Sequence, residues 1–362
     1  MSSAPPIVVV EDDLWMRLIG VVLDPATSAE RCAAFADFMS PDERDFAGWC
    51  DRLRARAGRL YPSEVRLVPS RAELSRHLPG ACALVVESFA VGKEELACAP
   101  RLRVVHKYGA VLRNVDVAAC SAAAVKVLGI RRRANIACAE HAFALILTLA
   151  RRIHRIAGFT SIERLAAAGL PYRPFDRRHA PSANFGRIGG MRSLNGGTIG
   201  IIGLGEIGRE IALRAAAFGM SILYFQRTRL SPAEEEALRV SYRPLEALLA
   251  ESDWVVPQLP ANAATRHLLD AGRLALMKRE ACLVNVSRAD VIERAALIAA
   301  LRSGRLGGFA LDPLYEEPGH SNDELLAFEN VVLTPHMAGS PRSNGLADIA
   351  DLIAALADAI LD

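Results

Sequence analysis

The chain has 362 residues, of which 51% are hydrophobic and 23% are charged, and its formal net charge is +2. A chain of this length is too long for a single hydrophobic core of ordinary size, so two domains are expected. The composition is typical of a globular protein rather than a disordered or fibrous one. A nearly neutral charge gives no reason to expect nucleic acid or a membrane surface as a partner.

The cysteines and the amino terminus indicate where such a protein works. Seven cysteines are scattered along the chain without a C-x-x-C pair. We therefore expect no disulfide framework and no structural zinc, and a reducing cytoplasm is the expected compartment. The amino terminus lacks a basic start followed by an apolar stretch, so no secretory signal is expected. No apolar run reaches the roughly eighteen residues that span a bilayer.

Short apolar runs alternate with helical patterns from residue 19 to about 130. Such alternation predicts a parallel sheet with helices on both faces. The stretch 28–59 is interrupted by Pro41, so two helices are expected there, the second capped by Ser40 or Asp42. The run Ile7–Val10 is a candidate for an extra edge strand. The expected strands are 19–23, 65–68, 83–87, 102–106 and 125–129, with helices such as 71–78 and 115–124 between them.

A long apolar helix is expected over about 137–157, and the segment 158–196 that follows is irregular and rich in Arg, Pro, Gly and Asn. Loops this long are usually functional or bind another subunit. A second alternating unit follows, and a helix at about 344–360 ends the chain. The expected strands of this unit are 198–202, 221–225, 253–257, 282–286, 307–311 and 331–334.

These patterns predict an α/β protein with two doubly wound parallel-sheet domains. We expect one unit over 128–341 and a smaller unit over 1–127 that would be completed by the returning helix 342–362.

The glycine motif Gly203-Leu204-Gly205-Glu206-Ile207-Gly208 follows the predicted strand 198–202 and precedes a predicted helix at 206–218. Gly203 would permit a tight turn, Gly205 would let a pyrophosphate approach the backbone, and Gly208 would bring helix and strand together. The helix N-terminus would offer its N–H groups to the phosphates. The alternative is a glycine-rich turn in an ordinary α/β sheet.

The residue after the next strand predicts which dinucleotide is accepted. Gln226 stands where an acidic residue usually holds the adenosine ribose hydroxyls. A neutral amide does not repel a 2′-phosphate, and Arg227 or Arg229 could pair with one. NADP(H) is therefore expected to be accepted. In the alternative, both arginines face solvent and NADH is used through Gln226.

Arg288, Glu317 and His336 each lie just past a predicted strand of the second unit. Because open parallel sheets bind ligands at the carboxyl ends of their strands, these side chains are expected at one edge. A guanidinium, a carboxylate and an imidazole together can bind a keto acid and exchange a proton with it. This combination predicts an enzyme of hydride transfer.

Several motifs in this order resemble the D-isomer-specific 2-hydroxyacid dehydrogenase family, which includes glyoxylate/hydroxypyruvate reductases and phosphoglycerate dehydrogenases. The resemblance covers about residues 60–345. It implies that 128–341 form a Rossmann dinucleotide-binding domain, and that 1–127 with the returning helix 342–362 form a smaller flavodoxin-like substrate domain. It rests on Gly203–Gly208, Leu283–Arg288, Ala310–Asp312 with Glu316–Pro318, and Thr334–His336, and the stretches Lys107–Ala110 and Ala139–Ala142 also match.

The resemblance implies a role for each site residue. Arg288 would bind the substrate carboxylate and keto oxygen. His336 would exchange a proton with the carbonyl oxygen while hydride moves from the nicotinamide, and Glu317 would hydrogen-bond His336 and favour its imidazolium form. Glu316 is the alternative partner of His336, although the offset from Asp312 favours Glu317.

The resemblance also implies residues that surround the ligands. Asp312 would contact the nicotinamide amide, the loop Pro257–Pro260 would lie beside the adenosine, and the backbone of Tyr108, Gly109 and Ala110 would cradle the substrate carboxylate. The arginine-rich segment 151–192 would form a dimerisation arm, so a homodimer is implied. The expected cofactor residues are Gly203, Gly205, Glu206, Ile207, Gly208, Gln226, Arg227, Pro257, Pro260, Ser287 and Asp312.

Two stretches depart from the family pattern. Ala289-Asp290 replaces the usual Gly-Gly and brings a carboxylate near the site. The substrate loop has Arg113 before Asn114, where the family usually has an acid. One hypothesis is that Arg113 recruits a second anionic group, such as a phosphate or a carboxylate. The alternative is a surface arginine that pairs with Asp116 or a neighbour.

The sequence therefore predicts a cytoplasmic, homodimeric, NAD(P)-dependent reductase of small 2-keto acids that forms the D-2-hydroxy product. No catalytic metal is expected, because the histidines lack metal-ligand spacing. One alternative is a non-enzymatic dinucleotide sensor that binds partner proteins, like the related transcriptional corepressors. Another is an oxidoreductase of an inorganic or one-carbon substrate, although Glu317 argues against formate, because the formate enzymes carry an amide there.

Overall fold

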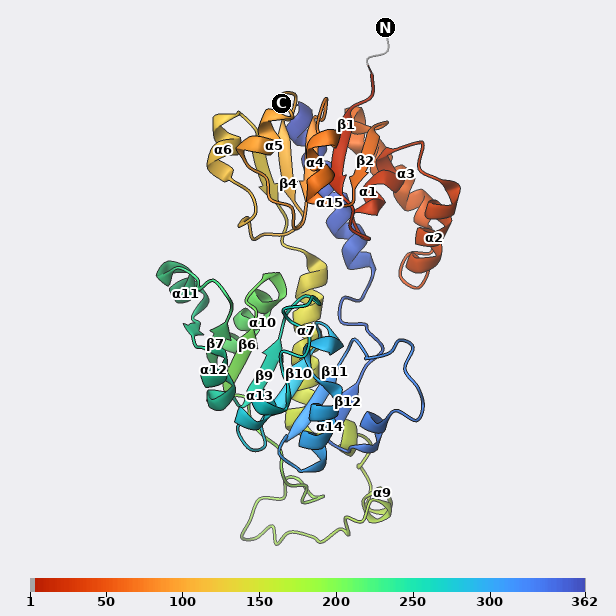
Figure 1. The fold of residues 1–362 in the computed structure, drawn as a ribbon. Coiled ribbons are helices and arrows are strands. Elements are labelled where there is room, and N and C mark those ends of the chain that lie inside the picture. The colour runs from red at the N-terminus through yellow and green to blue at the C-terminus, as the bar shows by residue number, and fades with distance from the viewer. Residues whose placement is uncertain (1–3, 362) are drawn as a thin grey trace. The chain divides into compact units, whose positions relative to one another are not determined.

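The computed structural model describes residues 4–361, and the chain divides into two compact units (Figure 1). Unit 1 consists of Met1–Ala137 and Gly339–Asp362, and unit 2 of Cys138–Ala338. The boundary expected at 127/128 falls inside unit 1. The chain stays packed on unit 1 through the first turn of α7 (Arg133–Arg151), because the buried Asp348 carboxylate accepts the Arg133 and Ala134 N–H groups at 3.0 and 3.4 Å.

Unit 1 contains a five-stranded parallel sheet in the order β2-β1-β3-β4-β5. This is the strand order of flavodoxin-like folds. The direction in which successive strands are added to the sheet reverses between β1 and β3. The strands are β1 (Ile7–Glu11), β2 (Glu64–Val68), β3 (Ala83–Val86), β4 (Val104–Lys107) and β5 (Lys126–Gly129).

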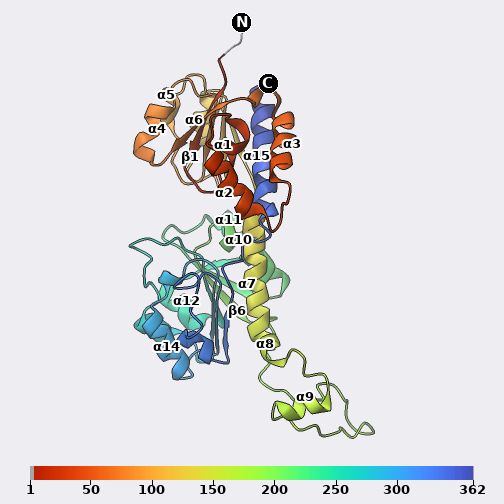
Figure 2. The same ribbon diagram turned by 90° about the vertical axis from the view of Figure 1, so that its right-hand side faces the viewer.

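Helices cover both faces of this sheet. One face, with Val8 and Val10, packs against α1 (Arg17–Leu23), α3 (Phe46–Ala57) and α15 (Ser343–Leu361). Figures 1 and 2 both show α15, drawn in blue, among the helices of unit 1. The other face packs against α4 (Arg71–His77), α5 (Lys93–Ala97) and α6 (Val117–Ala122). The remaining helices of this unit are α2 (Ala29–Met39) and the short 3-10 turn η1 (Gly58–Leu60).

Three expectations for unit 1 are wrong. Residues 19–23 form helix α1 rather than a strand, because an apolar run buried on all sides has the same pattern in either structure. Asp13 accepts the Trp15 and Met16 N–H groups just before this helix, at 2.8 and 3.3 Å. The run at Ile7–Val10 is an inner strand and not an edge, since β1 pairs with both β2 and β3. Asp45, rather than Ser40 or Asp42, caps the second helix of 28–59.

Unit 2 contains a seven-stranded parallel sheet in the order β12-β11-β10-β9-β6-β7-β8. Counted from β6, this is the Rossmann order with one added strand. Strands β6 and β7 have the expected bounds, whereas the two-residue strand β8 was not expected. The strands are β6 (Thr198–Ile202), β7 (Ser221–Phe225), β8 (Ser241–Tyr242), β9 (Trp254–Pro257), β10 (Cys282–Asn285), β11 (Gly308–Leu311) and β12 (Val331–Leu333).

Helices again cover both faces, so the prediction of two doubly wound sheets is confirmed. Helices α7 and α10 (Glu206–Ala217) pack on one face. Helices α12 (Leu245–Glu251), α13 (Ala271–Leu276) and α14 (Arg294–Arg302) pack on the other. Helix α11 (Pro232–Leu238) follows β7, and the 3-10 turns η2 (Ala289–Val291) and η3 (Glu324–Ala327) complete the unit.

The segment from 152 to 193 extends away from the rest of unit 2 (Figure 2). Arg152 has a left-handed backbone conformation that ends α7 earlier than expected, and α8 (Ile153–Ile156) follows. The segment is otherwise irregular, as expected, apart from α9 (Ile162–Ala167). Among residues 4–361, no helix combines the length and apolar character needed to cross a bilayer.

Candidate active site

The predicted functional residues of unit 2 follow its strands at the carboxyl edge of the sheet. Strand β6 leads into Gly203, β10 into Arg288, β11 into Asp312 and β12 into His336. This edge is where open parallel sheets bind ligands, because loops there meet at the reversal of strand order. The reversal in unit 2 lies between β6 and β9, directly beside the glycine motif.

The three glycines of the motif have three different geometric roles. Gly203 has φ +101°, and a Cβ there would lie 2.3 Å from the Gln258 carbonyl oxygen. A Cβ at Gly208 would lie 2.3 Å from the Gly203 carbonyl oxygen, so only glycine lets α10 pack this closely on β6. A Cβ at Gly205 would meet nothing within 4 Å. The backbone at Gly205, where α10 starts, therefore fits an approaching dinucleotide phosphate.

The first turn of α10 and the loop after β9 surround this glycine turn. Glu206 and Ile207 are half-buried in the first turn of the helix. Pro257 is buried at the end of β9 in register with Ile202, whereas Pro260 is exposed.

The residues after β7 bear on the choice of dinucleotide. Gln226 donates to the Thr228 carbonyl oxygen at 2.7 Å. Arg229 forms a two-point ion pair with Glu235, with both N···O distances 2.8 Å, and this pairing lowers the pKa of Glu235 to about 2. Arg227 is exposed and makes no ion pair within residues 4–361. Of the two arginines, Arg227 is thus the one that remains available.

His336 and Glu317 lie in contact although 19 residues separate them. His336 Nδ1 is 3.0 Å from Glu317 Oε2 and 2.9 Å from Oε1. Because an ionised carboxylate only accepts, Nδ1 carries the proton that is donated, and Nε2 is left for another partner. The hydrogen bond from His336 lowers the pKa of Glu317. Glu316 instead contacts His320, with 3.1 Å between Nε2 and Oε2.

Asp312 holds the turn that carries His336. Its carboxylate is completely buried and accepts from the Thr334 hydroxyl at 2.6 Å and from the Met337 and Ala338 N–H groups at 2.9 and 2.8 Å. Burial alone would raise the pKa of Asp312, but the donors around it, His141 and Thr334 foremost, hold it at about 2. In the structure, hydrogen-bond donors of unit 2 surround the Asp312 carboxylate. A contact between Asp312 and the nicotinamide remains a prediction.

Arg288 is an exposed side chain in the otherwise buried loop after β10, at the same sheet edge. Its guanidinium donates to the Ser287 carbonyl oxygen at 2.7 Å and, within the described chain, makes no contact with His336 or Glu317.

The sequence analysis missed Asn285, which is fully buried at the end of β10. Asn285 Oδ1 accepts from both the N–H and the hydroxyl of Ser287 at 2.8 Å, and Nδ2 donates to the Arg288 carbonyl oxygen at 2.8 Å. A polar residue inside an apolar strand was the available signal for this positioning role.

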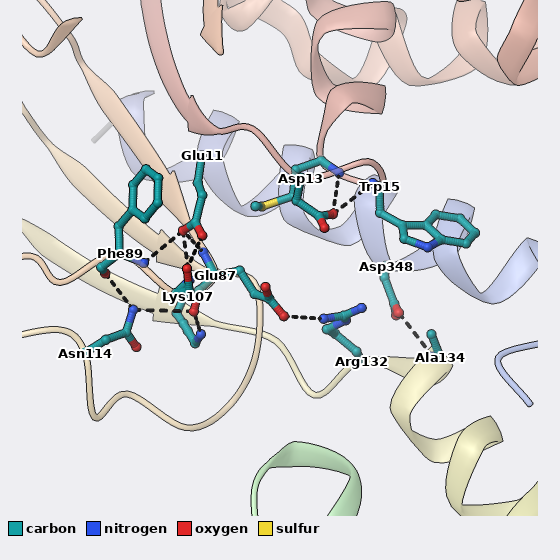
Figure 3. A network of polar contacts seen from close by, with 12 residues as sticks. Glu11, Asp13, Trp15, Glu87, Phe89, Lys107, Asn114, Arg132, Ala134 and Asp348 are labelled. Carbon is teal, nitrogen blue, oxygen red and sulfur yellow. Dashed lines mark hydrogen bonds and ion pairs between the residues drawn. The ribbon is translucent and has the colours of Figure 1, made fainter. Parts of the chain in front are cut away.

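The loop after β3 in unit 1 is held by a buried carboxylate (Figure 3). Glu11, at the end of β1, accepts the N–H groups of Glu87, Ser88 and Phe89 at 2.7, 2.8 and 3.0 Å. Lys107 donates to the Glu87 carbonyl oxygen. A row of backbone donors that could bind an anion at this reversal point is thus filled by the chain itself.

The predicted substrate loop lies beside this network. Tyr108 is buried, and its N–H donates to the Val86 carbonyl oxygen at 2.8 Å, so this N–H is already used within the sheet. Arg132 lies over the Tyr108 ring, 4.1 Å from its centroid. Arg132 also contacts Glu87 at 3.3 Å (Figure 3). Gly109 is buried and Ala110 is exposed.

The two family departures lie on the surface of their units. Arg113 is exposed, and the structure pairs it with no acid between residues 4 and 361. Asp116 instead caps α6 by accepting the Ala119 N–H at 2.9 Å. Asp290 is exposed in the turn η2. Within residues 4–361, no cluster of three His, Cys, Asp or Glu side chains is placed to hold a metal ion.

Comparisons with known proteins bear on the whole chain. Residues 143–338 match the family model of the D-isomer specific 2-hydroxyacid dehydrogenase NAD binding domain. The chain is 38% identical over 292 residues to a glyoxylate reductase of Pyrococcus furiosus, covering 80% of this chain and 82% of the relative. It is 36% identical over 295 residues to a glyoxylate reductase of Thermococcus gammatolerans, with coverages of 82% and 84%.

A solved structure agrees with these sequence comparisons. The D-mandelate dehydrogenase of Rhodotorula graminis in its holo form is similar with a TM-score of 0.55 and 25% identity, over 98% of this chain and 93% of that one. Three findings point to the same family. Both units are doubly wound, the glycine turn fits a dinucleotide, and the family model matches most of unit 2. The chain belongs to the D-isomer-specific 2-hydroxyacid dehydrogenase family, whose members are NAD(P)-dependent oxidoreductases.

Proposed function

We propose that this protein reduces a small 2-keto acid to the D-2-hydroxy acid with NADH or NADPH. The contact between His336 and Glu317 carries the proposal, because it lies at the same sheet edge as the glycine turn that fits a dinucleotide. A nicotinamide dinucleotide supplies the hydride when bound. Unit 2 would hold this dinucleotide at its glycine turn.

Each site residue would then have a separate role in the reaction. Arg288 binds the substrate carboxylate and keto oxygen as a planar fork. His336 gives its Nε2 proton to the carbonyl oxygen, since its Nδ1 is occupied by Glu317. Glu317 stabilises the imidazolium before this transfer. The N-terminus of α10 and Gly205 bind the pyrophosphate.

Glyoxylate is the first substrate to test, because the relatives are named glyoxylate reductases. The experiment follows NADH and NADPH consumption spectrophotometrically with glyoxylate, hydroxypyruvate and phenylpyruvate. Chiral chromatography of the hydroxypyruvate product should show the D isomer. If the protein binds NADH but consumes none with any of these keto acids, the reductase proposal fails and a dinucleotide sensor takes its place.

The acceptance of NADPH would depend on Arg227. Gln226 places no negative charge near a 2′-phosphate, and Arg227 has no competing ion pair, whereas Arg229 is held by Glu235. A guanidinium binds phosphate oxygens by charge-assisted hydrogen bonds.

The segment 152–193 would join two copies of the chain. It exposes several large apolar side chains, and such patches are typical of interfaces. Sedimentation velocity should therefore show a homodimer. The reducing cytoplasm stays a prediction from the cysteines. The exposed apolar residues are Ile153, Ile162, Tyr172 and Phe185.

A further inference from the structure

The turn that delivers His336 is unusual in its backbone. His336 has φ +50°, in the left-handed region that residues other than glycine seldom adopt. Conformations of this kind are strained and persist only where the surroundings impose them. The His336 N–H is bonded at 3.0 Å to the carbonyl oxygens of Asp312 and Thr334. The backbone carbonyl oxygen of Asp312 is therefore one of the two acceptors that fix the backbone at His336.

His141 is the one side chain from outside this turn that reaches the Asp312 carboxylate among the contacts of the described chain. It lies on α7, in the part of that helix that belongs to unit 2. Its Nε2 is 3.1 Å from the Thr334 hydroxyl and 3.3 Å from Asp312 Oδ1. Its side chain is 17% exposed, so solvent competes little for this contact.

The direction of each hydrogen bond follows from the proton inventory. Asp312 is ionised, since its pKa is about 2, and therefore only accepts. The Thr334 hydroxyl gives its single proton to Asp312 at 2.6 Å. The oxygen of Thr334 can then only accept a proton from His141. Both neighbours of His141 Nε2 are acceptors, so Nε2 must carry the hydrogen.

We propose that His141 is a positioning residue for His336. It completes the ring of donors around Asp312 together with Thr334, and this ring imposes the left-handed turn that brings His336 to Glu317. The effect is indirect, since the structure gives His141 no contact with His336 itself. The proposal rests on the proposed function for its catalytic consequence only, and its structural part stands without it.

The structural part is tested by nitrogen NMR of ¹⁵N-labelled histidine in the free protein, with signals assigned by substitution. His141 Nε2 should carry a proton in the wild type. The His336 signals should move in His141→Ala and return towards wild type in His141→Gln, whose amide can donate in place of Nε2. His154→Ala is the matched control, because His154 is exposed and contacts the Glu329 carbonyl oxygen rather than Asp312 or Thr334, and it should leave His336 unchanged.

The catalytic part is tested on the same variants with glyoxylate and NADH. In His141→Ala, kcat should fall on the order of 10-fold to 10²-fold, the scale for a displaced reacting group, while the Kd for NADH stays within about twofold. His141→Gln should recover most of the loss. A bare Nε2 in the wild type, or unmoved His336 signals in His141→Ala, would overturn the proposal. A wild type that reduces no keto acid would overturn the proposed function, while the NMR result still decides the role of His141.

Discussion

His336 Nδ1 lies 2.9 Å from Glu317 Oε1, and this contact joins the loop after β11 to the loop after β12. The carboxylate also accepts the Leu314 N–H at 2.9 Å, so its own position is held by the backbone. The imidazole is thereby oriented with Nε2 turned away from its partner. Both side chains are about half exposed, at 50% and 42%, as a residue that must meet a substrate requires.

Replacing His336 should remove proton transfer without removing the cofactor site. His336→Gln is expected to lower kcat by ~10² to 10⁴-fold, the usual contribution of general acid–base catalysis. The Kd for NADH, measured by fluorescence titration, should stay within about twofold. His320→Gln is the control, since His320 contacts Glu316 and not Glu317. A fully active His336→Gln variant would remove His336 from the mechanism.

The pH dependence should follow the charge of Glu317. Its pKa lies below the ordinary value of 4.5 because His336 donates to it. A carboxyl with a lowered pKa contributes its stabilisation above the ordinary value and loses it as the pH falls through the lowered one. The contact should therefore be intact from about pH 5 upwards. In Glu317→Gln the side chain carries no charge at any pH, so the loss of kcat/KM for reduction at acid pH that follows protonation of Glu317 should disappear. An acid limb that is unchanged in this variant would contradict this role.

Two glycine substitutions should separate folding from cofactor binding. Gly205→Ala places its Cβ in open space, so the melting temperature should be unchanged, while NADH binding weakens by about tenfold because the Cβ blocks the phosphates. Gly208→Ala places its Cβ 2.3 Å from a backbone oxygen, so it should lower the melting temperature as well. Gly189→Ala, where a Cβ would meet nothing, is the control for both measurements. Equal effects at positions 205 and 208 would contradict the assignment.

The dinucleotide preference should respond to Arg227 more than to Arg229. Arg227→Ala is expected to lower kcat/KM for NADPH about tenfold and to leave that for NADH unchanged, because one charge-assisted contact to the phosphate is lost. Arg229→Ala should have the smaller effect, since Arg229 is already paired with Glu235. If NADPH kinetics are insensitive to Arg227, the 2′-phosphate is bound elsewhere or not at all.

The buried Asp312 should make the free energy of unfolding depend on pH in the acid range. Its pKa falls from 3.8 to about 2 on folding, which corresponds to roughly 2 kcal/mol of stabilisation. This contribution is complete above pH 3.8 and disappears as the pH falls to about 2. The difference in free energy of unfolding between wild type and Asp312→Asn, measured with urea, should therefore shrink over this interval. A constant difference would show that the Asp312 charge has no such effect.

The amino-acid sequence predicted those features that repeat along the chain or depend on local chemistry. The bounds of β6 and β7 followed from apolar runs next to turn residues, and the glycine spacing predicted a turn that the structure contains. The order of motifs placed Glu317 and His336 after neighbouring strands. Parallel sheets put such residues at one edge, so their proximity could be expected.

Long-range packing decided the rest. Residues 19–23 are buried on every side, and a pattern without a polar face cannot distinguish helix from strand. β1 is an inner strand because two other strands, distant in sequence, pair with it. The left-handed turn at His336 depends on donors that converge on Asp312 from α7 and from the loop after β12. A one-dimensional pattern records the residues of this network, but only folding brings them within hydrogen-bond distance.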